Sequence, residues 1–189
     1  MYLLFQLVQV TYWLALATWF GGVLFVAICA PVIFRTIGQA RPLLPAVLSA
    51  NLENQHASLL AGSVVAAILG VLVKVELGCA AALLATQVGQ WVVADTTASD
   101  QRLAAIVRAA LFVAATGIVI YDWRILWPRI VRLRRQYIDH ADEPEIANPV
   151  REQFDACHRR SVSLMSLKLF LLLGMILFSG GIAYGRVIL

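Results

Sequence analysis

Two histidines and one methionine are the side chains of this sequence best suited to hold a metal ion or a haem. His56 precedes one apolar run of the chain and His158 precedes another, and Met165 follows His158 in the second run. Imidazole suits copper and iron, and a thioether is a soft ligand for copper. These apolar runs are long enough to cross a membrane, and histidines at the ends of such helices can also be structural, because their hydrogen bonds to backbone hold the helices in register. We favour the structural interpretation and keep binding of haem b or copper as the alternative.

The residues around His158 show a regular spacing. Phe154, His158, Ser161, Met165 and Lys168 are separated by four, three, four and three positions. This spacing places them on one face of a helix. Because polar side chains are costly against lipid, we expect this face to turn toward other helices.

Asp122 is a further polar residue expected at the depth of the histidines. His56, Asp122 and His158 each lie at the end of a different apolar run. A buried polar group left without a partner costs about 1–3 kcal/mol. The sequence therefore predicts that both histidines face the interior and bond to Asp122, to Ser161 or to backbone.

Two cations, Lys168 and Arg108, lie inside apolar runs. A charge at the centre of a bilayer costs about 2.5–3.5 kcal/mol on insertion scales, so such residues need a partner or a function. If Lys168 is paired, Asp122 and Glu53 are its candidate partners, and Glu76 is the candidate partner of Arg108. For Lys168 we favour the simpler interpretation that its side chain reaches back to the nearby interface.

The composition identifies the bilayer as the solvent of this protein. Of 189 residues, 61% are hydrophobic and 14% are charged, against roughly 45–50% and about 25% in soluble domains. The length suits a single membrane domain, residues 1–189. The net charge of +4 indicates membrane topology rather than nucleic-acid binding, because the arginines cluster between apolar runs. The three cysteines form no CxxC pair and are expected to be free thiols.

Four stretches are long and apolar enough to cross a membrane. They are residues 3–30, 57–73, 103–121 and 161–184. The connections 34–55 and 122–160 carry two and eight arginines respectively, which places both in the cytoplasm and requires an even number of crossings between them. Residues 77–94, also apolar, are therefore interpreted as a helix extension or as an interfacial or re-entrant piece. Both termini are then outside.

The long connection 122–160 is expected to contain helix. Its first part should extend the third helix past Pro128, which a helix tolerates at its start or at a kink. In its second part, Asn148 is a candidate N-cap and Pro149 suits the first helical position. The last helix should therefore begin in the cytoplasm.

Small residues indicate where helices approach closely. Gly181 and Gly185 form a GxxxG pair, and Gly62 lies between Ser58 and Ala66 in a small-xxx-small series. Both patterns are typical of packing faces in membranes. The sequence has no phosphate-binding loop, HExxH or nucleophile elbow, so we expect a non-catalytic protein.

Several of these motifs together resemble a known family. The stretch FDACHRRS has the pattern Phe-x3-His-x2-Ser before the last apolar run, TWFGGVLFVAICAPVIFR lies in the first run, and WRILWPR follows the third. With His56, they resemble the domain of unknown function 4149 family, which includes transmembrane protein 205. Met165 departs from it, because relatives often have Asn there. The WFGG helix is also distantly similar to copper-resistance D-like membrane bundles, some of which handle copper or haem.

The resemblance implies a four-helix membrane protein and no particular reaction. We therefore expect an all-α, four-helix bundle in the inner or plasma membrane, with a long cytoplasmic loop between its third and fourth helices. Its most suitable role is that of a non-catalytic structural or accessory subunit of a larger membrane assembly, such as an electron-transfer or light-driven complex. The alternatives are a haem b or copper protein using His56 and His158, and a small-solute channel or carrier using Lys168 and Arg108.

Overall fold

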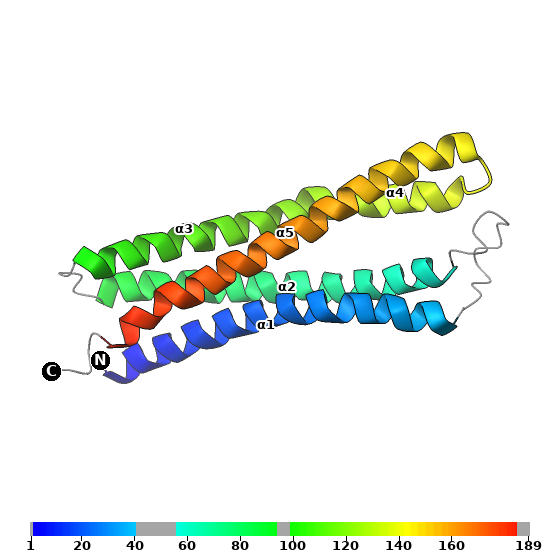
Figure 1. The fold of residues 1–189 in the computed structure, drawn as a ribbon. Helices are drawn as coiled ribbons and strands as arrows, with labels where there is room; N and C mark the ends of the chain where they lie inside the picture. Colours follow the sequence, from blue (N-terminus) through cyan, green and yellow to red (C-terminus); the bar gives the residue numbers. More distant parts are fainter. Residues whose placement is uncertain (1, 41–55, 94–98, 185–189) are drawn as a thin grey trace. The chain divides into compact units, whose positions relative to one another are not determined.

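The chain is all-α. The computed structural model describes residues 2–40, 56–93 and 99–184, and no strand occurs in these ranges. The helices are α1 (Tyr2–Ala40), α2 (His56–Val93), α3 (Ser99–Tyr121), the short π-helix η2 (Asp122–Leu126), α4 (Trp127–Asp139) and α5 (Pro144–Tyr184), as Figure 1 shows.

Within these described ranges, four helical rods are long and apolar enough to cross a membrane. They are α1, α2, the continuous run α3–η2–α4, and α5. Their lipid-facing character is seen in exposed side chains such as Leu14, Val113 and Phe170, which are 64, 67 and 68% exposed. Apolar side chains at this exposure suit a hydrocarbon solvent, so the chain is a multi-pass membrane protein and its fold is a helical bundle.

Residues 77–93 continue α2 without a break. Of the possibilities raised by the sequence for 77–94, the structure has the helix extension, and Ala94 lies outside the described residues. The run ALLATQVGQ contains no proline and only one glycine, so nothing in it stops the helix. Glu76 therefore lies in the middle of α2 rather than beyond its end.

The connection 122–160 is a helical hairpin rather than an open loop. Only His140–Glu143 form a turn between α4 and α5. Helix α5 begins at Pro144, earlier than the expected Asn148, and the backbone carbonyl of Glu143 accepts the N–H groups of Ile146 and Ala147 at 3.0 and 2.9 Å. Pro144 takes the first helical position because a missing N–H costs nothing there.

A π-turn joins α3 to α4. The Trp127 N–H donates to the carbonyl of Asp122 across η2. Pro128 follows at the start of α4 and lacks an N–H, and its ring would crowd the carbonyl one turn earlier in a regular α-helix. The wider turn avoids that clash, so the third rod passes Pro128 without ending, as the sequence indicated.

The structure divides into two compact units, and every rod contributes to both. The first unit contains the described residues 2–23, 73–93, 99–119 and 166–184. Its fully buried side chains include Leu16, Leu83, Leu172 and Met175. Close approach is visible at Gly174 in α5, where an added Cβ would lie 3.1 Å from a methyl group of Leu111 in α3.

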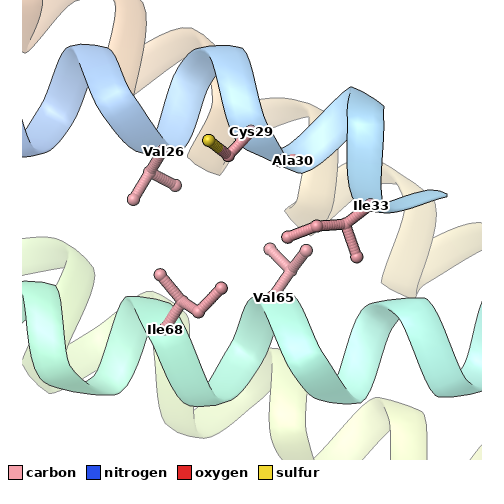
Figure 2. A pocket seen from close by; sticks show the side chains of 6 residues that line it. All are labelled: Val26, Cys29, Ala30, Ile33, Val65 and Ile68. Carbon is pink, nitrogen blue, oxygen red and sulfur yellow. The ribbon is translucent and has the colours of Figure 1, made fainter. Parts of the chain in front are cut away.

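The second unit contains the described residues 24–40, 56–72 and 120–165. Here Leu126, Leu133 and Cys157 form a buried cluster between η2–α4 and α5. Elsewhere in this unit, side chains of α1 and α2 face one another, with Val26 and Ile33 opposite Val65 and Ile68 (Figure 2). This apolar seam leaves no room for a water molecule.

Candidate functional site

An ion pair is buried among the helices of the first unit. The Lys168 Nζ of α5 lies 2.5 Å from Oε1 of Glu76 in α2, and the two side chains are 4% and 1% exposed. The indole Nε1 of Trp19 in α1 donates to the same carboxylate oxygen at 3.1 Å. Three helices thus meet at one carboxylate.

The expectation that Lys168 reaches back to the interface was wrong, because the residue is 3% exposed and paired with Glu76. Asp122 was also wrong as its candidate partner. Asp122 instead accepts a hydrogen bond from Ser161 Oγ at 3.3 Å, and Glu53 lies outside the described residues. The error followed from the expected end of the second span at residue 73. Because α2 continues to Val93, Glu76 lies among the helices and is free to pair with Lys168.

Arg108 is the second buried cation of this unit, and its predicted pairing with Glu76 was also wrong. Arg108 is 2% exposed. Its Nη2 donates to Gln90 Oε1 at 2.8 Å, and its guanidinium lies 5.1 Å from the centre of the Tyr12 ring. Its Nε has no acceptor within the described residues. Since Glu76 and Lys168 cancel, Arg108 leaves one net positive charge among the buried side chains that the structure describes in this unit.

Further polar side chains extend the network around Arg108. Gln90 Nε2 approaches Gln9 Oε1 at 3.4 Å. Ser179 Oγ donates to the Met175 carbonyl at 2.6 Å, so the Tyr12 hydroxyl, also 2.6 Å from Ser179 Oγ, is the donor to it. This part of the unit is therefore a hydrogen-bonded polar interior in an apolar protein.

Two polar atoms nearby are buried without a partner in the described part of the chain. They are the amide nitrogen of Gln87 in α2 and the hydroxyl of Thr116 in α3. Groups of this kind are normally satisfied by water or by a ligand.

The histidines do not share an environment. His56 is 6% exposed at the start of α2, as expected, whereas His158 is exposed and stacks on Phe154 with ring centres 6.1 Å apart. The prediction that His158 faces the interior was wrong, because the helix turns Cys157 inward instead. Met165 is half-buried, and the described residues contain no group of three or more His, Cys, Asp or Glu side chains placed to hold a metal ion.

Of the glycines that the sequence indicated as packing positions, the structure describes the surroundings of Gly62. A Cβ added to Gly62 would lie 3.9 Å from the guanidinium of Arg134. That guanidinium donates to the Leu59 carbonyl and to Ser63 Oγ at 2.6 Å each. Gly62 thus leaves space for a side chain of α4. Gly185 lies outside the described residues, as do the side-chain surroundings of Gly181.

The sequence interpretation missed Trp19, Gln87 and Gln90 as members of the network. A signal was present: Glu76, Leu83, Gln87 and Gln90 follow one another at seven, four and three positions, which is one helical face. It becomes visible only when residues 77–93 are treated as part of the second helix.

The fold and these contacts define a multi-pass helical membrane protein with a buried polar network. The chain belongs to the family described as domain of unknown function (DUF4149), whose model matches residues 14–139. That range contains Glu76 and Arg108 but neither Lys168 nor the Phe-x3-His-x2-Ser motif at 154–161. No curated protein matches the chain significantly. No solved structure does so either.

Proposed function

We propose that the protein is a non-catalytic subunit of a larger assembly in the inner or plasma membrane, and that it binds its partner through one face of α2. This face consists of Lys74, Gly78, Ala81 and Ala85, and we call it the α2 small-residue face. All four residues are exposed, and their spacing of four, three and four positions places them in one stripe along the helix.

The exposed cation Lys74 carries the proposal. No carboxylate of the described residues forms an ion pair with it. A lysine that faces hydrocarbon is costly, and a carboxylate on a neighbouring helix would remove that cost. The partner is therefore expected to present a membrane helix with an Asp or Glu.

Gly78, Ala81 and Ala85 supply the space for that helix. An added Cβ at Gly78 would meet no atom within 4 Å. Small residues let helix backbones approach closely, which replaces the hydrophobic effect as the source of association in lipid. The neighbouring exposed positions of α2 carry bulkier side chains, such as Val71 and Leu84, which suit lipid contact.

The experiment compares Gly78→Leu with Gly117→Leu. Gly117 in α3 is also exposed and also open around its Cβ position, so the two changes add the same side chain in similar surroundings. Tagged chains are purified from native membranes in mild detergent, with a photo-crosslinker at Ala81. We expect Gly78→Leu and Lys74→Glu to remove a crosslink to an acidic membrane helix that Gly117→Leu retains.

Purification of the unaltered chain as a monomer, without any Ala81 crosslink, would contradict the proposal. Equal loss of the crosslink in Gly78→Leu and Gly117→Leu would contradict it as well.

A small-solute carrier is the second candidate, favoured by the polar interior of the first unit. Within the described residues, Arg108 offers an unused Nε–H and Gln87 an unused amide nitrogen. Uptake of small anions into liposomes, compared between the unaltered chain and Arg108→Gln, tests this candidate. The haem b or copper alternative through His56 and His158 is tested by a visible absorption spectrum and metal analysis of the purified protein.

A further inference from the structure

We propose that a hollow in the second unit binds the phosphate group of an anionic ligand, with a phospholipid headgroup as its most suitable source. The hollow has a volume of about 230 Å³ and lies between η2–α4 and α5. Arg129 and Gln153 line it together with Arg160, and its wall also includes Ile125 and Ala156. We call it the arginine hollow.

The two arginines of the hollow have their N–H groups available. Neither forms an ion pair with a carboxylate of the described residues. The guanidinium of Arg160 lies over the Tyr121 ring at 5.4 Å, an electrostatic contact that holds the cation at the wall of the hollow. Arginine N–H groups in this planar arrangement match two oxygens of one phosphate.

A third arginine adds to the local positive charge. Arg124 in η2 lies over the ring of Trp123 at 4.6 Å, and it too has no carboxylate partner among the described residues. Cations at this density attract an anion more strongly than one arginine alone. The hollow also lies beside a π-turn, and such turns frequently occur at functional sites.

The position of the hollow along its helices suits a lipid headgroup. In α5 the sequence changes from polar to apolar at Ser161, directly after Arg160, and in the third rod it changes from apolar to polar after Tyr121. Trp123 is 40% exposed, and tryptophan is enriched at membrane interfaces. Basic pockets between membrane helices on the cytoplasmic side are typical binding sites for acidic phospholipids.

The size and lining of the hollow agree with this ligand. A water molecule takes up about 30 Å³ in the liquid, so the hollow has room for a phosphate together with several waters. The apolar side chains of Ile125 and Ala156 would contact the glycerol and the first acyl carbons. Free phosphate would use the arginines alone.

The test measures lipid retention by the purified full-length chain. The protein is exchanged into micelles that contain either phosphatidylglycerol or phosphatidylcholine, and native mass spectrometry counts the bound lipids. Inorganic phosphate is titrated in a separate experiment. The variant Arg129→Gln/Arg160→Gln is compared with Arg132→Gln/Arg135→Gln. The control removes the same charge from exposed positions of α4 outside the hollow.

We expect phosphatidylglycerol to bind the unaltered chain and the control alike, and at least ten-fold more weakly to Arg129→Gln/Arg160→Gln. Binding of inorganic phosphate alone, lost in the same variant, would support the site and make the free anion its ligand. Equal lipid retention by both double variants, without saturable phosphate binding, would overturn the proposal. A far-UV circular dichroism spectrum equal to that of the unaltered chain is required of each variant.

Discussion

Removal of one partner of the Lys168–Glu76 pair should strongly destabilise the protein. Lys168→Met keeps an unbranched side chain, one atom shorter, but leaves the Glu76 carboxylate, 1% exposed, with the Trp19 N–H as its remaining described partner. Breaking a buried pair in this way costs roughly 3–5 kcal/mol. That corresponds to a change of about two to almost four orders of magnitude in the unfolding equilibrium.

The double variant Lys168→Met/Glu76→Gln separates the charge from the packing. Glutamine retains an oxygen that can accept the Trp19 N–H, and no uncompensated charge is left. Because replacing both charges of a buried pair is often neutral, this variant should recover most of the loss. The assay is unfolding of the detergent-solubilised protein by increasing mole fraction of dodecyl sulfate, followed by circular dichroism.

An exposed pair in the same chain is the control. His140 Nδ1 and Glu143 Oε1 lie 3.6 Å apart, with side chains 42% and 59% exposed. Exposed pairs contribute about 0–1 kcal/mol, so Glu143→Gln should shift the midpoint little. The reasoning is refuted if Lys168→Met unfolds at the midpoint of Glu143→Gln, or if the double variant is no more stable than Lys168→Met.

Two further predictions concern packing and topology. Gly117→Ala, where an added Cβ meets no atom within 4 Å, should stabilise α3 by up to about 1 kcal/mol through helix propensity. Gly174→Ala should gain less or lose stability, because the added Cβ would lie 3.1 Å from Leu111. The same unfolding assay compares the two variants, and equal gains would contradict the close approach at Gly174. In a variant without native cysteines, Asp142→Cys should react with a membrane-impermeant maleimide only from the cytoplasmic side and Ser99→Cys only from the outer side; labelling of both from one side would rule out the proposed four-span topology.

The apolar runs and the arginine distribution were enough to predict an all-α bundle with four membrane-capable helices. These properties follow from local composition, which helix formation in a bilayer depends on directly. Family membership was also predicted correctly. The ion pair and hydrogen bonds of the interior were not predicted. Side chains of different helices pair only at the same depth in the membrane, and ending the second helix at residue 73 placed Glu76 beyond the helix.

The histidines show a different limit of sequence reasoning. The spacing around His158 correctly indicated a helical face, and Lys168 on that spacing is buried. His158 is nevertheless exposed while Cys157 is buried. At 3.6 residues per turn, or about 100° per residue, His158 lies about 80° around the helix from Lys168, whereas Cys157 lies about 20° from it. His158 is therefore at the edge of the face, and Cys157 lies on its buried side.

The length of the rods has a consequence for the choice of membrane. Helix α1 has 39 residues, or about 58 Å at 1.5 Å per residue, and α2 has 38. The exposed apolar side chains of α1 extend from Leu3 to Phe34, about 47 Å along the axis, whereas a typical hydrocarbon core is about 30 Å thick. Such a mismatch is relieved by tilting the helix, thickening the lipid around it or covering its end with protein. The protein should therefore partition into the thicker regions of its membrane, and lipids with longer acyl chains should stabilise it more than short ones.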